Sequence, residues 1–210
     1  GKMGKEVCQA VTDNPNTELV AMIDIASQGM YHSIEDAHRV QDIDVLVDFT
    51  QPDSIYENAK FCLNNGIKIV IGTTGLKDNE IETLCIIAPN FSTGAVLMMM
   101  FAKLAGKYFD NAEIIELHHN QKKDAPSGTA IKTANLMSEA KSDFAKGNCE
   151  ETETIEGARG GKSYSNIHIH SVRMPGYIAS EEVIFGAQGQ ILKLAHHSTD
   201  RTCYMSGILM

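Results

Sequence analysis

The sequence of 210 residues lacks the cysteine patterns that define disulfide-bonded and zinc-bound folds. Its cysteines are odd in number and widely scattered, and no two of them form a C-x-x-C pair. They are Cys8, Cys62, Cys85, Cys149 and Cys203. This usage indicates neither a disulfide framework nor a zinc knuckle, and it fits a reducing compartment. We therefore expect a cytoplasmic protein.

Positive charge and long apolar runs are also scarce. The 18 lysines and arginines face 27 acidic residues, a net charge of −9, whereas a nucleic-acid surface needs a basic footprint. No apolar run approaches the length of a membrane span, and no signal peptide is recognised. Because the hydrophobic share of 43% is ordinary for a folded domain, disorder is not expected. We expect partners that are neither nucleic acid nor membrane.

Both ends of the sequence are unusual. The chain starts at Gly1 without a methionine, and it stops at Met210 inside what the pattern predicts to be an amphipathic helix. We expect both termini to be cut, with the first strand of the first domain lying before residue 1.

The first half of the chain alternates helices with short apolar strands. A helix is predicted from the first residues to residue 13, and further helices at 52–65 and 76–84. Strands are predicted at 19–23, 43–49, 67–71 and 85–88. This alternation, with strands rich in β-branched residues, predicts an α/β domain with a Rossmann-like, doubly wound parallel sheet.

Two features of this half point to a dinucleotide. A glycine turn and a helix precede a strand that ends at Asp24, about 20 residues on, where a carboxylate can reach ribose hydroxyls. A second turn, Gly72–Gly75, follows a strand's carboxyl end, where open α/β sheets bind ligands. An ordinary helix start followed by any strand explains the first feature equally well.

After Ser92 the pattern changes to that of an α+β domain. Helices are predicted at 95–109 and 129–146, and strands at 165–174, 182–185 and 190–196. Consecutive strands with short turns predict a mixed sheet. A last helix from residue 200 or 201 is expected to return to the first domain. We therefore expect a dinucleotide-binding domain of 1–92 with 201–210 and a substrate-binding and oligomerisation domain of 93–200.

Two further patterns are interpreted as structural. The methionine-rich stripe of the 95–109 helix is more typical of a core than of a ligand site. His168 and His170 share one strand face, and His196 and His197 end another strand, but no metal-ligand spacing accompanies them. We interpret these histidines as polar sheet faces and expect no metal.

The segment from Glu113 to Ala130 concentrates the residues that carry chemistry. It begins as a predicted strand and then supplies two histidines, two lysines and an aspartate between residues 118 and 124. Ser127 can cap the following helix, so that Gly128 and Thr129 present backbone N–H groups at the positive end of its dipole. A small anionic substrate that needs a proton fits this segment. A solvated, charged loop is the alternative.

With these residues in place, the chain resembles the 4-hydroxy-tetrahydrodipicolinate reductase family. The most specific match is Glu116–Ala130, E-L-H-H-N-Q-K-K-D-A-P-S-G-T-A, which is similar to the family's E-x-H-H-x-x-K-x-D-A-P-S-G-T-A. Further family segments match in the right order at Val47–Ser54, Gly72–Gly75, Ala88–Ser92 and Ser171–Gly176. The resemblance covers essentially the whole chain.

The resemblance implies an NAD(P)H-dependent reductase of lysine and diaminopimelate biosynthesis that is a homotetramer. It implies that His118 is the proton donor and that Lys122 is a second acid that steadies the charged intermediate. It implies a dicarboxylate clamp of His119, Gly128 and Thr129. The cofactor contacts that it implies are Gly1, Lys2, Met3, Asp24, Gly72, Thr73, Thr74, Ala88, Pro89, Asn90 and Phe91. Because no arginine follows Asp24, we expect NADH to serve at least as well as NADPH.

The chain departs from the family pattern in several places. The first strand and first fingerprint glycine are absent, the segment before Ala88 is short, and the family chain continues past Met210. Asn120 stands where arginine is frequent. Three alternatives stay open: another two-domain dehydrogenase, a non-catalytic nucleotide-binding relative, and a truncated inactive fragment of the enzyme.

Overall fold

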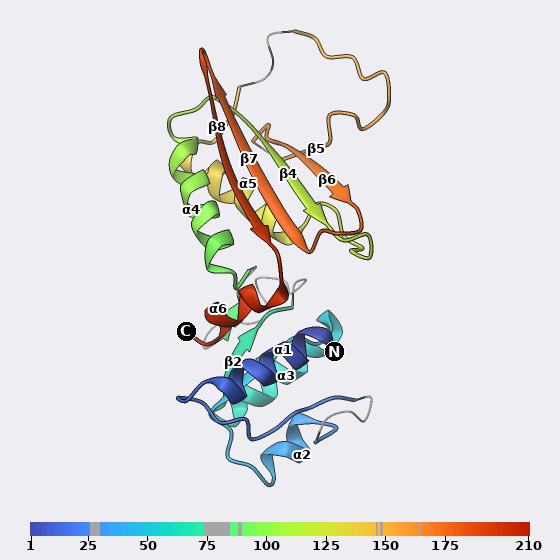
Figure 1. The fold of residues 1–210 in the computed structure, drawn as a ribbon, viewed down its shortest axis with the longest axis vertical. Coiled ribbons are helices and arrows are strands. Elements are labelled where there is room, and N and C mark those ends of the chain that lie inside the picture. Colours follow the sequence, from blue (N-terminus) through green and yellow to red (C-terminus); the bar gives the residue numbers. More distant parts are fainter. Residues whose placement is uncertain (26–29, 74–84, 88–89, 146, 148, 164) are drawn as a thin grey trace. The chain divides into compact units, whose positions relative to one another are not determined.

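The computed structural model describes residues 1–25, 30–73, 85–87, 90–145, 147, 149–163 and 165–210 (Figure 1). The chain divides into two compact units, one of Gly1–Phe91 with Tyr204–Met210 and one of Ser92–Cys203. No helix in the described ranges has the length and apolar character needed to cross a membrane.

The first unit contains a parallel sheet, as predicted. Its strands β1 (Val45–Asp48), β2 (Lys68–Ile71) and β3 (Cys85–Ile87) pair in that order, all parallel. The helices are α1 (Lys2–Asp13), α2 (Ile34–His38), α3 (Pro52–Asn64) and α6 (Met205–Ile208). Burial of Val7 on α1 with Phe91, Met205 and Ile208 joins the end of the chain to this unit.

One predicted strand of this unit is wrong. Residues 19–22 are not in a strand, and Ile23 makes only an isolated bridge to Tyr31. The carbonyl of Met22 accepts hydrogen bonds from Met30 and Tyr31, at 2.8 and 3.0 Å, so it closes a local turn instead of a strand ladder. The predicted helix at 76–84 and residue 88 lie outside the described residues.

The second unit contains a mixed five-stranded sheet, which confirms the predicted α+β character. Its order is β5-β6-β4-β7-β8, in which β4 and β6 are parallel and the other pairs antiparallel. The strands are β4 (Asn111–His118), β5 (Gly161–Lys162), β6 (His168–Arg173), β7 (Ala179–Ala187) and β8 (Gln190–Ser198). The helices are α4 (Thr93–Gly106) and α5 (Gly128–Ala140), and a 3₁₀ turn spans Arg201–Tyr204.

Both helices pack against the same face of this sheet (Figure 1). The predicted alternation holds, since Ile167 and Ile169 are buried in the core while His168 and His170 are partly exposed. Met98 and Met99 are core residues, as predicted, whereas Met100 is 58% exposed. The core side chains are Met98, Met99, Ala102, Ala112, Ile114, Ala130, Ala134, Met137, Phe144, Ile167, Ile169, Val183 and Phe185.

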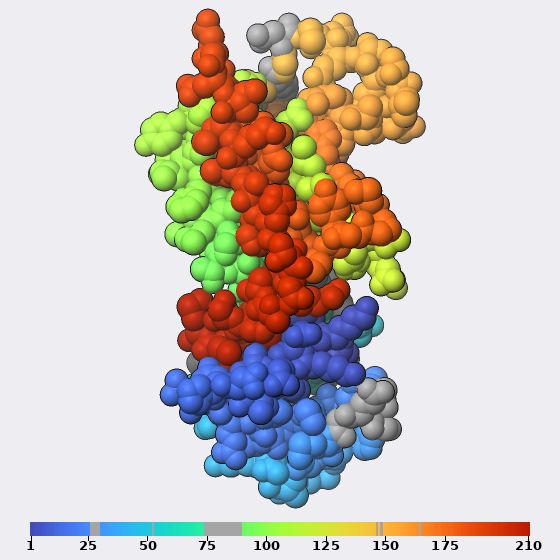
Figure 2. Space-filling model, in the orientation of Figure 1, coloured from blue at the N-terminus to red at the C-terminus, as the bar shows by residue number. Residues whose placement is uncertain are grey.

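The helix α5 is shorter than predicted, because it ends at Ala140 and not near residue 146. Phe144 is fully buried in the core, and its N–H donates to the carbonyl of Ser165 at 3.1 Å. The chain therefore leaves the helix at Lys141, which has extended backbone angles. Farther on, the described residues between 149 and 160 contain no helix or strand, and they project from the rest of the second unit (Figure 2).

Candidate active site at the end of β4

A buried carboxylate lies at the centre of the candidate site. Glu116 and His118 are two residues apart on β4 and therefore share the face of the sheet that the helices cover. Arg173 is the register partner of His118 on the parallel strand β6. Although Glu116 is fully buried, both of its oxygens accept hydrogen bonds.

Several neighbouring groups donate hydrogen bonds to Glu116. The Nδ1 atom of His118 lies 2.5 Å from one oxygen. Both terminal nitrogens of Arg173 donate to the carboxylate, at 2.8 and 2.7 Å, in a two-point contact. The backbone N–H of Ser127 donates to the other oxygen at 3.2 Å. Burial raises the pKa of Glu116, but the hydrogen bonds from His118, Arg173 and Ser171 outweigh it and lower that pKa to about 2.

The ionised carboxylate fixes the orientation of the imidazole. With Nδ1–H of His118 donated to Glu116, Nε2 is the ring atom left for proton exchange. The side chain of His118 is 14% exposed, so part of the ring is accessible to a ligand. This arrangement is typical of a general acid held in place by a carboxylate.

A tight loop follows His118 and brings in Lys122. The N–H of Lys122 donates to the carbonyl of His119 at 3.2 Å. The ammonium of Lys122 lies 2.8 Å from both oxygens of Asp124. Arg173 also donates to the carbonyl of Asp124, at 2.8 Å, which ties this loop to β6. Burial raises the pKa of Asp124, but the hydrogen bond from Lys122 outweighs burial, so the pKa lies below its ordinary value.

The start of α5 completes this group. The Ser127 hydroxyl accepts from the N–H of Ala130 at 3.2 Å, which confirms the predicted N-cap. Gly128 and Thr129 are the first residues of the helix, and its first turn carries no acidic residue. A carboxylate is therefore favoured at this positive helix end. The contacts described above join His118, Lys122 and this helix start at one end of the sheet.

Sequence reasoning missed three residues that organise the site. Glu116, Asp124 and Arg173 all lie in segments that match the family, but no role was predicted for them. The signal in the sequence was Glu116 itself, a charge on the face of β4 where Ala112 and Ile114 are buried. A buried charge requires a partner of opposite sign.

The first unit holds the residues predicted to contact a cofactor. Lys2 and Met3 form the first turn of α1, which Gly1 caps and which contains no acid, so its N–H groups favour a phosphate. The amino group of Gly1 lies 3.3 Å from the carboxylate of Asp24. Thr74, Ala88 and Pro89 lie outside the described residues. These contacts are compatible with a dinucleotide.

The carboxyl ends of β1 and β2 lie at one edge of the parallel sheet. A Cβ atom at Gly72 would lie 2.1 Å from the ring of Phe49, so any larger residue at this position requires that ring to move. Thr73 donates its hydroxyl to the carbonyl of Thr50 at 3.3 Å. Phe91 is buried in the core, and its ring centre lies 6.1 Å from that of Phe49. Asn90, just before it, is partly exposed.

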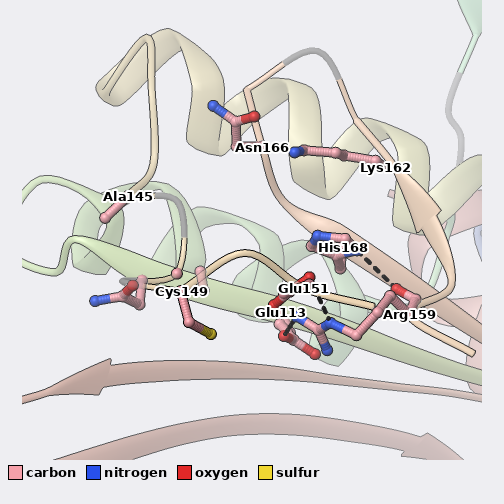
Figure 3. A pocket seen from close by; sticks show the side chains of 11 residues that line it. Glu113, Ala145, Cys149, Glu151, Arg159, Lys162, Asn166 and His168 are labelled. Carbon is pink, nitrogen blue, oxygen red and sulfur yellow. Dashed lines mark hydrogen bonds and ion pairs between the residues drawn. The ribbon is translucent and has the colours of Figure 1, made fainter. Parts of the chain in front are cut away.

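A second charged cluster lies on the opposite face of the second unit's sheet (Figure 3). It lines a cavity of about 300 Å³, in which Arg159 contacts Glu113 at 2.6 Å and Glu151 at 3.3 Å. His168 Nδ1 lies 2.7 Å from the Arg159 carbonyl, and His170 contacts Glu113 at 2.8 Å. Within the described ranges, no three His, Cys, Asp or Glu residues are arranged to hold a metal.

Comparison with known proteins identifies relatives over the whole chain. Residues 1–99 match the family model "Dihydrodipicolinate reductase, N-terminus" and residues 94–210 match "Dihydrodipicolinate reductase, C-terminus". The 4-hydroxy-tetrahydrodipicolinate reductase of Gloeothece citriformis is 45% identical, with 100% of this chain and 88% of the relative covered. That of Streptococcus pneumoniae serotype 19F is 48% identical, with 99% and 88% covered.

A solved structure gives the same result at the level of the fold. The dipicolinate-bound dihydrodipicolinate reductase of Paenisporosarcina sp. TG-14 is 42% identical and superposes with a TM-score of 0.84. The match covers 100% of this chain and 88% of that one.

Proposed function

The chain belongs to the dihydrodipicolinate reductase family, and we propose how it performs the family's reaction, the NAD(P)H-dependent reduction of 4-hydroxy-tetrahydrodipicolinate to tetrahydrodipicolinate. This reaction belongs to lysine and diaminopimelate biosynthesis. The observation that carries the proposal is the imidazole of His118 held on a buried, ionised Glu116 beside Lys122 and the start of α5. The test is an assay of turnover that follows the loss of absorbance of the reduced nicotinamide after freshly generated substrate is added. Absence of turnover would overturn the proposal.

In the proposed mechanism the chain's own residues supply protons and charge. When bound, the nicotinamide would supply the hydride, and the hydroxyl group at position 4 of the substrate would leave as water. His118 donates a proton from Nε2 to the substrate, and Glu116 stabilises the ring while it is protonated. Lys122 is a second acid, and its positive charge stabilises the charged intermediate. His119 with the N–H groups of Gly128 and Thr129 holds the two carboxylates.

We propose that the first unit binds the dinucleotide through Gly1, Lys2, Met3, Asp24, Gly72, Thr73, Thr74, Ala88, Pro89, Asn90 and Phe91. The start of α1, which has no side-chain cap, and the close approach of Gly72 to the Phe49 ring support this assignment. We assign 1–92 with 201–210 to this domain and 93–200 to substrate binding and assembly.

We also propose a cytoplasmic homotetramer built through the open face of the second unit's sheet. In support, α4 and α5 cover only the other face, and Ile191 of β8 is 71% exposed. Light scattering measures the assembly, and a monomer mass would reject it.

Binding of pyridine-2,6-dicarboxylate tests the clamp. We expect it to compete with substrate and to bind about tenfold more weakly, or worse, to Thr129→Pro, because one N–H donor to a charged group is lost. Proline is tolerated in the first turn of a helix, and the Ser127 cap to Ala130 does not use this N–H. Calorimetric titration measures the affinity.

The matched control is Thr129→Val, which keeps the N–H and removes only the hydroxyl. We expect it to bind the dicarboxylate more tightly than Thr129→Pro does. Equal affinity in both variants and in the unmodified protein, or a crystal soak that places the ligand away from residues 127–130, would reject the clamp.

Cofactor choice depends on Asp24. Its carboxylate can accept hydrogen bonds from both adenosine ribose hydroxyls, whereas a 2′-phosphate there would meet like charge. Ile25 and Ala26 follow it, so no arginine is adjacent to hold that phosphate. We propose that NADH is used at least as well as NADPH, and that Lys2 leaves measurable NADPH activity.

The measurement is kcat/KM for each cofactor, in the unmodified protein and in Asp24→Asn. The variant is expected to gain NADPH activity relative to NADH, because the repelling charge is removed. A preference of about tenfold or more for NADPH in the unmodified protein, worth about 1.4 kcal/mol, would contradict this role of Asp24.

A further inference from the structure

A second buried glutamate lies directly beside Glu116. Glu181 on β7 is the antiparallel register partner of Glu116, and on its other side its partner is His196 of β8. Its side chain lies on the helix-covered face in line with the core residue Val183 and is only 4% exposed. Directly opposite residues in such a pair have Cβ atoms about 5 Å apart, so the two carboxyl groups are neighbours.

The two carboxyl groups have very different surroundings. Neither oxygen of Glu181 has a hydrogen-bond partner in the described part of the chain, whereas Glu116 is bound by Arg173 and His118. The hydroxyl of Thr133 on α5 is close enough to Glu181 to lower its pKa, although its hydrogen bond at 3.0 Å is donated to the Thr129 carbonyl. Two carboxyl groups this close and this unequally solvated ionise at different pH values, with Glu116 ionising first.

The groups that face Glu181 come from each neighbouring element. The titratable or charged ones are Glu116 on β4, with Arg173 and His118 attached to it, and His196 on β8. The buried faces of α4 and α5 carry no charged side chain. Burial, and then the charge of Glu116, raise the pKa of Glu181 to about 7, although Thr133 acts to lower it.

We propose that Glu181 is a positioning residue that acts through Glu116 to keep His118 in its proton-donating form as the pH rises above neutral. When Glu181 ionises, it adds a negative charge beside the Glu116–His118 pair, and that charge favours the protonated imidazole. The proton-donating form of His118 then persists to higher pH than it would if residue 181 were a neutral side chain. This inference rests on the proposed function, in which His118 donates the proton.

The first test is the pH profile of kcat/KM for Glu181→Gln, a neutral side chain of nearly the same shape. We expect its alkaline limb to lie about half to one pH unit below that of the unmodified protein, the size of one charge interaction at this range. The matched control is Glu182→Gln, the next residue, which lies on the opposite face and contacts Lys193 at 2.6 Å. Its profile should be unchanged. A role in stability alone would move the unfolding temperature and leave the alkaline limb in place.

The second test measures protons taken up when pyridine-2,6-dicarboxylate binds, by calorimetry in buffers of different ionisation enthalpy. The unmodified protein should take up a larger fraction of a proton near neutral pH than Glu181→Gln does. Equal uptake and superimposable pH profiles would overturn the inference, as would equal shifts in both glutamine variants. If the enzyme does not turn over, the proposed function fails, and proton uptake still tests Glu181. If Glu181→Gln does not fold, the test is carbon NMR of the unmodified protein with labelled glutamate. The inference requires one buried carboxyl group that titrates near neutral pH, and the absence of such a group would overturn it.

Discussion

His118→Gln is expected to lower kcat by at least about 10²-fold, the usual size of general acid catalysis. Glutamine can still donate an N–H to the carboxylate of Glu116, but it carries no proton to transfer. Lys122→Ala is expected to cause a loss of the same order, because it removes the second acid and the positive charge beside the substrate. Affinity for the nicotinamide should be nearly unchanged in both variants. Steady-state kinetics and cofactor titration measure the two quantities.

A matched control separates this effect from a general loss of histidine. His168 lies on the opposite face of the same sheet, where its Nδ1 contacts the Arg159 carbonyl at 2.7 Å. His168→Gln should therefore keep near-normal kcat. Near-normal kcat in both His118→Gln and Lys122→Ala would reject the assignment of the proton donors.

Local patterns were sufficient to predict most of the strands and helices. Alternation from Ile167 to His170 predicted which face of β6 is buried, because side chains on a strand point to opposite faces in turn. Ser127 was predicted to cap α5 because its hydroxyl can accept an N–H from the residue three positions on. Such contacts are set by residues close together in the sequence.

The centre of the site could not be predicted in the same way. Glu116 and Arg173 are 57 residues apart, and they meet only because β6 pairs in parallel with β4. The order of strands in a mixed sheet is not encoded in any one strand. The misplaced end of α5 has a similar cause, since the burial of Phe144 depends on contacts with Ser165 and the distant core.

The ion pair at this centre leads to a prediction about stability. Arg173→Met is expected to lower the free energy of unfolding by about 3–5 kcal/mol, because it leaves the fully buried Glu116 carboxylate without its cation. The matched control is Arg159→Met, whose partner Glu113 is 37% exposed, so the loss there should be about 0–1 kcal/mol. Urea unfolding followed by circular dichroism measures both. Similar losses in the two variants would show that the burial of Glu116 does not govern the energetics of this pair.

The pH dependence gives this prediction a second, independent check. In the unmodified protein the pKa of Glu116 is lowered from 4.5 to about 2, so its stabilising effect is present above 4.5 and is lost as the pH falls through about 2. Without Arg173, burial is opposed by fewer hydrogen bonds, and the carboxyl group in the variant protonates at higher pH. The stability gap between the two proteins should therefore be widest at neutral pH and shrink in acid. Adding Glu116→Met to Arg173→Met should recover most of the loss at neutral pH, because removing both charges of a buried pair is far less costly than removing one. A gap independent of pH, with no recovery in the double variant, would mean that Arg173 stabilises the protein by packing and not by its charge.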